Sequence, residues 1–356
     1  MSKAQKTAVI LFNLGGPDKA ESIKPFLFNF FMDKNIIGAP KPIRWLISKL
    51  ISNRRSKKEA GESYGFLGGG SPLLKNTQAQ AEVLQAVLPK HMKVFVSMRY
   101  WHPMAAEVLK QVKKWGAKKI ILLPLYPQYS TTTSFSSIED WQKTAKKLEI
   151  DLPTKTICCY PWQAGWIEAG RQHLASSYNK ALFTAKEKGF KPPRILFSAH
   201  GLPEKIIQKG DPYQWQCEQT AQKLADALMV EGLDWQICYQ SRVGPLKWIG
   251  PSVEEALEKA AADQVPVIIY PHAFVSEHVE TLVELDIEYR HLAKKRGIVY
   301  YDVVPTVSVN EAFIQGLGDM VKMADKRDID IAPDNGERLC PNTFKKCPCA
   351  IMPEAA

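Results

Sequence analysis

The sequence predicts an α/β protein with two domains, each built on a parallel β-sheet flanked by helices. At 356 residues with 45% hydrophobic content, the chain is long enough for two packed cores. Short β-branched runs recur along it, and each is followed by a polar loop and a stretch with helical periodicity. The runs form two groups on either side of a long helical stretch at 166–188, which predicts two Rossmann-like domains with a ligand-binding cleft where they face each other.

Each domain is expected to hold a four-stranded sheet. The first domain spans residues 1–162, and its strand candidates are 7–13, 93–98, 119–125 and 156–160. The second domain spans 163–323, and its candidates are 194–199, 236–241, 265–270 and 298–304. Residues 324–356 lose the periodicity, so we expect a linker followed by a short cysteine-bearing tail.

Charge and cysteine content narrow the class of protein. A net charge of +10 suits a nucleic acid, a membrane surface or an anionic substrate, but no basic stripe or motif spacing of a nucleic-acid reader is present, so no nucleic-acid partner is expected. The first apolar run ends at Gly15-Gly16-Pro17, which indicates a buried strand and not a signal peptide. Seven cysteines are an odd number for a disulfide framework, so metal ligation is the better hypothesis.

Residues 26–58 are dense in Phe, Ile, Leu and Trp and end in a basic cluster. Two interpretations are open: an ordinary core helix pair, or an exposed apolar lip whose basic rim favours contact with a membrane.

The acidic segment at 276–289 is the first candidate site. We expect a helix capped by Ser276, and at about 100° per residue its glutamates fall on one face. They are Glu277, Glu280, Glu284 and Glu288, with His278 near the edge of the stripe. Such a row invites a cation, although a solvated acidic face is the common alternative. Because a buried strand precedes it, the first turn should lie at the carboxyl edge of a sheet, where α/β folds bind ligands.

His200 is the second candidate, since it ends the strand candidate 194–199 at the same kind of edge. An imidazole there suits proton transfer or metal binding, although a lone histidine is more often structural. No G-x-G-x-x-G spacing supports a dinucleotide site.

A series of motifs, in one order over residues 8–320, resembles the ferrochelatases. They are NLGGP at 13–17, GGGSP at 68–72, Arg99-Tyr100, YPQYS at 126–130, SAHGLP at 198–203, QSRVGP at 240–245, Trp248 and the segment 274–289. The resemblance implies the two-domain chelatase fold and an enzyme that inserts ferrous iron into protoporphyrin IX to form protohaem, the last step of haem synthesis.

The resemblance also implies roles for individual residues. His200 and Glu280 would face the pyrrole nitrogens, and Glu277, His278 and Glu284 would form a path for protons or metal. Iron would enter along this row or from the side of Arg99, and both routes are open. The porphyrin-binding set would be Leu14, Arg99, Tyr100, Tyr129, Trp248 and Phe274, although the apolar members could equally be plain core.

The tail carries three cysteines in a C-x6-C-x-C pattern. Three thiolates and a fourth from elsewhere would complete a zinc site or a 2Fe-2S cluster. A subset of ferrochelatases resembles this arrangement and binds 2Fe-2S, with the fourth ligand from the end of the first domain. Cys158 or Cys159 fits that place, and strand alternation would point them to opposite faces, so only one can serve. The resulting set is Cys158, Cys340, Cys347 and Cys349, which leaves Cys217 and Cys238 as packing residues.

The resemblance assigns the segment 26–58 to the mouth of the porphyrin site, close to a membrane surface. It implies a cytoplasmic enzyme. Peripheral attachment to the inner face of the membrane and the formation of a homodimer are both left open. The rival hypotheses are a chelatase for coproporphyrin III or another tetrapyrrole, and a non-catalytic iron-sulfur or haem-binding protein.

Overall fold

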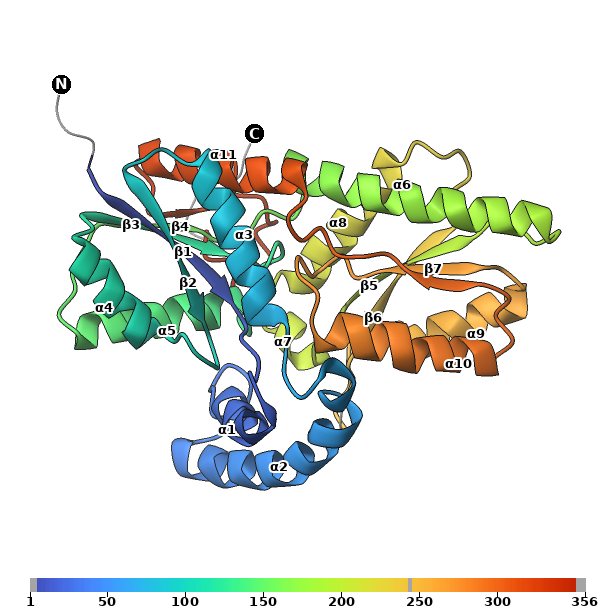
Figure 1. Ribbon diagram of the computed structural model, residues 1–356, viewed down its shortest axis with the longest axis horizontal. Helices are drawn as coiled ribbons and strands as arrows, with labels where there is room; N and C mark the ends of the chain where they lie inside the picture. Colours follow the sequence, from blue (N-terminus) through green and yellow to red (C-terminus); the bar gives the residue numbers. More distant parts are fainter. Residues whose placement is uncertain (1–4, 243–244, 350–356) are drawn as a thin grey trace. The chain divides into compact units, whose positions relative to one another are not determined.

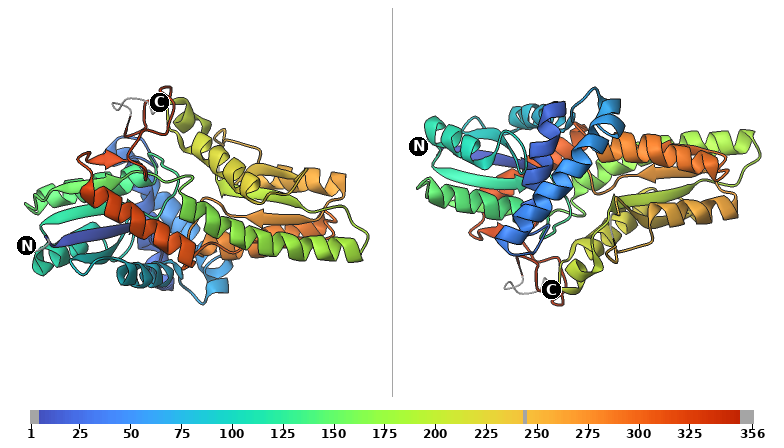
Figure 2. Two further views of the ribbon diagram at one scale, coloured as in Figure 1. Left: turned by 90° about the horizontal axis from the view of Figure 1, so that it is seen from above. Right: turned by 90° about the horizontal axis from the view of Figure 1, so that it is seen from below.

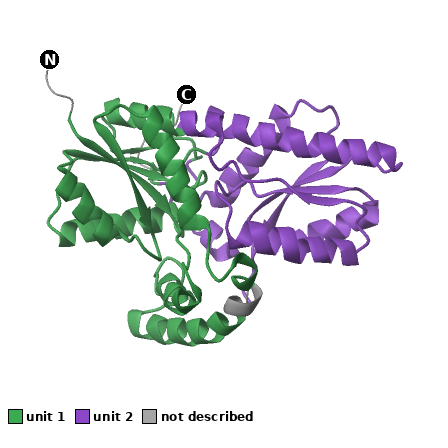
Figure 3. Ribbon diagram, in the orientation of Figure 1, with its two compact units in different colours: residues 1–160, 317–341, 348–356 green, residues 161–316, 342–347 purple. Residues whose placement is uncertain are grey.

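A computed structural model describes residues 5–242 and 245–349. The chain forms two compact units (Figure 3). The chain passes from unit 1 into unit 2 after Tyr160 and returns at Leu317, and unit 1 then keeps 317–341. Residues 342–347 belong to unit 2, where the Lys346 amide donates to the carbonyl of Gly210 (3.0 Å).

Unit 1 is built on a parallel sheet with the strand order β2-β1-β3-β4-β9 (Figure 1). Its strands are β1 (Thr7–Asn13), β2 (Met92–Met98), β3 (Lys119–Pro124), β4 (Thr154–Ile157) and β9 (Ile331–Ala332). The first four confirm the predicted strands. The fifth corrects the prediction of a four-stranded sheet, because part of the expected linker pairs with β4 in parallel register.

Several helices connect these strands. They are α1 (Ala20–Phe31), α2 (Lys41–Glu62), the short η1 (Gly65–Leu67), α3 (Leu73–Val87), α4 (Ala105–Trp115) and α5 (Ser134–Lys147). Of these, α3, α4 and α5 contact strands of the sheet. One core lies between the sheet and α4 and α5, where Phe12 of β1 meets Trp141 edge-on at 5.7 Å. α11 (Glu311–Lys326) contains the point at which the chain returns from unit 2.

α1 and α2 pack against each other and settle the two interpretations of 26–58. α1 buries Phe26, Leu27 and Phe31, as a core helix does. α2 instead leaves Trp45 46% exposed and Leu50 61% exposed. The segment is therefore half core and half exposed apolar surface.

Unit 2 has a parallel sheet in the order β6-β5-β7-β8, which confirms the four predicted strands. The strands are β5 (Arg194–His200), β6 (Trp235–Gln240), β7 (Val267–Tyr270) and β8 (Tyr301–Val303). Helices α6 (Ala164–Glu187) and α8 (Tyr213–Ala227) cover one face, and α9 (Val253–Asp263) and α10 (Tyr289–Lys295) cover the other (Figure 2). The short α7 (Glu204–Gln208) follows β5.

The acidic segment folds differently from the expected α-helix. It forms a π-helix, η2 (Glu280–Glu288), whose N-cap position is Val279. Ser276 therefore does not cap it, and that prediction was wrong. A π-helix closes i→i+5 hydrogen bonds, is rare, and is frequently found at functional sites. Among the described residues, no helix of the chain has both the length and the hydrophobicity to cross a membrane.

Candidate functional site

The candidate site lies at the carboxyl edge of the sheet of unit 2. β5 and β6 pair in parallel with His200 opposite Gln240, so these two side chains end neighbouring strands. β7 pairs with the other side of β5, and the chain runs from it into η2. Because parallel strands end at one edge, this topology brings His200, Gln240 and the first turn of η2 together.

The centre of the site is a pair formed by His200 and Glu280. His200 Nδ1 lies 3.0 Å from Glu280 Oε2, and His278 Nε2 lies 3.8 Å from the same oxygen. The His200 side chain is 36% exposed and that of Glu280 22% exposed, so the pair is shielded yet accessible to a ligand. The prediction that these residues act together is consistent with this geometry.

Charge on Glu280 decides the protonation of the pair. Burial alone would lower the pKa of His200, but the neighbouring Glu280 carboxylate raises that pKa above its ordinary value of 6.5. Burial likewise would raise the pKa of Glu280, and His200 with His278 outweigh it, so the carboxyl pKa falls. His200 therefore binds a proton more tightly than a free imidazole, and Glu280 keeps its negative charge to lower pH than a free carboxyl group.

Glu284 is the second carboxylate of the site and is held by β6. Its carboxylate accepts hydrogen bonds from the Ser241 amide (2.8 Å), the Ser241 hydroxyl (2.5 Å) and Gln240 Nε2 (3.1 Å). Ser241 has a φ of 63°, a left-handed conformation that is uncommon for serine. Burial and the charge of Glu280 nevertheless raise the pKa of Glu284 to about 7. This carboxyl group can therefore exchange protons near neutral pH.

The raised pKa of Glu284 predicts a pH-dependent stability. Since 4.5 is its ordinary value, the folded protein holds the proton more tightly than the unfolded chain. Its stabilising contribution is complete below pH 4.5 and is lost as pH rises through 7. We expect Glu284→Gln, relative to the parent, to gain roughly 1–3 kcal/mol of unfolding free energy between pH 5 and pH 8. Urea titrations at both pH values measure this, and a constant difference would contradict the raised pKa.

The expected row of glutamates divides into separate environments. Glu277 accepts a hydrogen bond from the Thr306 amide at 2.7 Å and another from the Thr281 hydroxyl. Glu288 is exposed to solvent. Gln240 Nε2 donates to the Glu284 carboxylate at 3.1 Å and to the backbone carbonyl of Glu280 at 3.3 Å, and the charge of Glu280 raises the pKa of Glu284. The single stripe of four carboxylates is therefore corrected to these two.

His278 is the second histidine of the site and is nearly buried. Its Nδ1 lies 3.1 Å from the Ser276 carbonyl, and its ring packs on Phe274 with centroids 4.7 Å apart. Trp248 lies near the other histidine, because a Cβ on Gly201, the residue after His200, would come within 3.4 Å of the indole. Phe274 thus packs on one histidine, and Trp248 lies against the glycine that follows the other.

In unit 1, Arg99 and Tyr100 form a buried network around Asp33. Arg99 Nη2 donates to Asp33 Oδ2 at 3.1 Å, and the Tyr100 hydroxyl donates to the same oxygen at 2.7 Å. Ser136 also donates to it, and Arg99 Nε donates to Ser136 at 2.8 Å. The guanidinium is therefore occupied by protein groups, which suits a positioning role.

The other predicted porphyrin contacts of unit 1 differ in exposure. Leu14 is partly exposed, and its carbonyl accepts from the Tyr100 amide at 3.0 Å. Tyr129 is 2% exposed, which is the burial of a core residue.

All seven cysteines are buried. Cys158 Sγ lies 3.6 Å from Cys349 Sγ and 3.8 Å from Cys159 Sγ. The prediction that Cys158 and Cys159 point to opposite faces of a strand is therefore wrong. β4 ends at Ile157, so the alternation of side chains along a strand does not apply to these two residues. Cys217 in α8 and Cys238 in β6 lie within the hydrophobic cores of unit 2.

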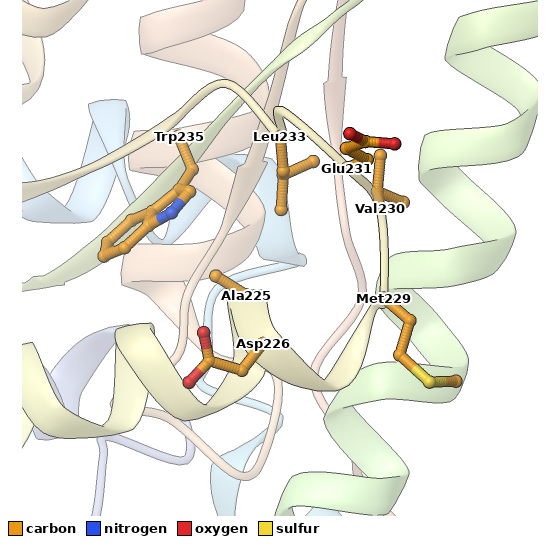
Figure 4. A pocket seen from close by; sticks show the side chains of 7 residues that line it. All are labelled: Ala225, Asp226, Met229, Val230, Glu231, Leu233 and Trp235. Carbon is orange, nitrogen blue, oxygen red and sulfur yellow. The ribbon is translucent and has the colours of Figure 1, made fainter.

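A surface hollow elsewhere in unit 2 is not part of this site. Its lining residues surround the turn between α8 and the start of β6 (Figure 4): Ala225, Asp226, Met229, Val230, Glu231, Leu233 and Trp235. It lies at the amino end of β6, whereas Gln240 ends that strand. Within residues 5–242 and 245–349, no three His, Cys, Asp or Glu side chains are grouped as ligands for one metal ion.

Sequence reasoning missed the residues that support the site. Gln240 and Ser241 hold Glu284, and Thr306 holds Glu277. Gln240 and Ser241 lie in the QSRVGP motif, which the resemblance includes, but the motif does not indicate what these two residues do. The role of Asp33 cannot be predicted from the sequence, because a single aspartate in an apolar segment does not indicate which distant side chains it binds.

Known proteins match the chain closely. The family model described as Ferrochelatase matches residues 6–325. The ferrochelatase of Pelagibacter ubique (strain HTCC1062) is 46% identical and covers 97% of this chain and 98% of that protein. The ferrochelatase of Wolbachia sp. subsp. Drosophila simulans (strain wRi) is 49% identical over 88% of this chain and 98% of its own.

A solved structure shares the fold at low identity. The sirohydrochlorin chelatase SirB of Bacillus subtilis subspecies spizizenii, in complex with cobalt, has a TM-score of 0.51 and 11% identity, with 90% of this chain and 95% of that chain covered. This likeness supports the predicted chelatase fold.

Proposed function

The chain belongs to the ferrochelatase family, and we propose on that premise that His200 and Glu280 form its metal-insertion centre. The enzyme inserts ferrous iron into a porphyrin in haem synthesis. The observation that supports the assignment is the 3.0 Å contact between the two side chains at the carboxyl edge of a sheet, with Glu284 beside them.

The chemistry requires two pyrrole N–H protons to leave as the metal arrives. A neighbouring carboxylate makes His200 a stronger base, and the carboxyl pKa of about 7 makes Glu284 an acceptor that is neither always charged nor always neutral. In this proposal the neutral form of His200 takes a pyrrole proton, and Glu280, Glu284 and His278 relay protons away. Glu277 supports the loop that carries His278 through its hydrogen bond to Thr306.

The flat macrocycle needs apolar and aromatic walls. Phe274, which packs on His278, and Trp248, which lies against Gly201, are the best supported of these, and Leu14 and Tyr129 complete the proposed set. We assign Arg99 and Tyr100 to positioning through Asp33.

An anaerobic assay with ferrous iron tests the substrate. Protoporphyrin IX is expected to give protohaem, followed by the change in visible absorption. The rival substrate, coproporphyrin III, is assayed in parallel at equal concentration. If coproporphyrin III is turned over faster than protoporphyrin IX, then coproporphyrin III is the substrate. If neither porphyrin yields a haem product, the catalytic function is refuted.

We further propose that Cys158, Cys340, Cys347 and Cys349 hold a 2Fe-2S cluster. All four are buried, and the 3.6 Å between Cys158 Sγ and Cys349 Sγ is close to the roughly 3.8 Å expected for two thiolates on a tetrahedral metal with bonds of about 2.3 Å. Cys159 is the alternative fourth ligand, since its sulfur is also near. The cluster would serve structure or sensing, because insertion of ferrous iron needs no electron transfer.

The exposed face of α2 supports peripheral binding to a membrane from the cytoplasm. Ile43, Trp45, Leu46 and Leu50 are each 46% exposed or more, and Lys49 lies 4.8 Å from the Trp45 ring. An apolar face with basic neighbours is typical of helices that lie on anionic lipid. The homodimer stays a prediction from the resemblance, to be tested by light scattering.

Removing apolar groups from α2 should weaken lipid binding. Two buried side chains of this size contribute about 1.5–3 kcal/mol each, so Leu46→Ser with Leu50→Ser should reduce binding to anionic vesicles at least about tenfold. Vesicle co-sedimentation measures this. Phe183→Ser, on an equally exposed residue of unit 2, is the control that should bind as the parent does. Equal loss in both variants would contradict a membrane role for α2.

A further inference from the structure

The segment after α11 extends the sheet of unit 1. Backbone hydrogen bonds join β9 to β4, among them those from the Thr156 amide to Asp330 (2.6 Å) and from the Cys158 amide to Ala332 (3.0 Å), and the Asp334 amide donates to the carbonyl of Cys159 (3.1 Å). A strand of two residues makes few such bonds. Its position therefore depends on side chains that tie it down.

Besides Lys155 of β4, which donates to the Asp328 carbonyl (2.6 Å) and to the Asp330 carboxylate (3.0 Å), Arg327 provides these ties. Its Nη2 donates to the Thr156 carbonyl of β4, and its Nη1 donates to the carbonyls of Pro333 (3.0 Å) and Ala332 (3.4 Å). Nε donates to Ile329 at 3.2 Å. One planar guanidinium thus joins β4 to the segment that contains β9. Its N–H donors point in several fixed directions and reach separate carbonyl groups at once, which the compact ammonium group of a lysine could not do.

The thiol of Cys349 lies close to both β9 and the end of β4. Its sulfur is 3.6 Å from Cys158 Sγ and 3.9 Å from the carbonyl of Ile331 in β9. Cys158 is anchored to β9 by its own amide. The spacing of the two sulfurs therefore follows from how β9 lies on β4.

We propose that Arg327 is a positioning residue that fixes β9 to β4 and thereby holds Cys349 beside Cys158. The use of this thiol pair as cluster ligands rests on the proposed function. The positioning itself does not, since it concerns hydrogen bonds within unit 1.

Hydrogen exchange of the full-length protein tests the positioning. In Arg327→Leu the carbonyls lose their donors, and backbone amides in 154–160 should exchange about tenfold faster or more, while those of β1 stay unchanged. Lys322→Leu is the matched control: it removes one positive charge from α11, which ends directly before Arg327, and should exchange as the parent does; Lys322 contacts Asp319 of the same helix. Unchanged exchange in Arg327→Leu would overturn the inference.

A second variant guards against misfolding. Arg327→Lys keeps the charge but loses the fork, so exchange in 154–160 should still accelerate, and exchange as slow as in the parent would overturn the role of the guanidinium. Iron-sulfur absorption, followed during exposure to a chelator, should fade faster in both variants than in Lys322→Leu. If the parent shows no such absorption while exchange in the variants accelerates, the cluster is refuted and the positioning role is supported.

Discussion

Replacing His200 with alanine is expected to lower kcat/KM for haem formation by about 100-fold to 10,000-fold, the usual contribution of a positioned acid-base group. The alanine removes the imidazole that would accept a pyrrole proton and leaves Glu280 without its partner at 3.0 Å. Haem formation from ferrous iron and protoporphyrin under anaerobic conditions measures the effect.

Two controls separate chemistry from folding in this experiment. His102→Ala removes an exposed histidine of unit 1 and should keep parental turnover. Glu280→Gln keeps the size of the side chain but removes the charge that raises the pKa of His200. Its pH profile should therefore shift to lower pH. Unimpaired turnover in His200→Ala would refute the assignment of that residue.

Cys349→Ser is expected to abolish the visible iron-sulfur absorption of the purified protein. A serine hydroxyl is a far poorer ligand for this cluster than a thiolate, and the remaining three cysteines leave one iron incompletely coordinated. Absorption spectra with iron and sulfide analysis provide the measurement, and Cys347→Ser and Cys340→Ser should behave alike.

The same spectra decide the fourth ligand. Cys158→Ser should lose the band and Cys159→Ser should keep it; the reverse result would move the ligand to Cys159. Cys217→Ser, in the core of unit 2, is the control and should keep its absorption. A band that persists in Cys349→Ser would exclude that residue as an essential ligand.

Much of the fold follows from local pattern. The eight strands expected from β-branched runs are present because each is long enough to be recognised and is buried in a parallel sheet. β9 was missed because two residues carry no periodicity, and its pairing depends on Arg327, a side chain distant from β4 in sequence.

The sequence predicts the residues of the proposed site, but it does not predict their geometry. His200 and Glu280 follow from their places after strands, since parallel strands share an edge. The π-helix was not predictable, because the spacing of the glutamates fits an α-helix equally well. The Ser241 amide donates to Glu284 while Ser241 has a left-handed backbone conformation. Serine has no preference for that conformation, so the sequence does not predict it.

The two residues of β9 also determine how the first sheet ends. Without them, β4 would present a row of unpaired amides and carbonyls, a template for pairing with another chain. The added strand is too short to serve as such a template, and Pro333, which directly follows it, has no amide hydrogen to offer. The same segment that brings Cys349 to Cys158 thereby protects the sheet from aggregation through its edge.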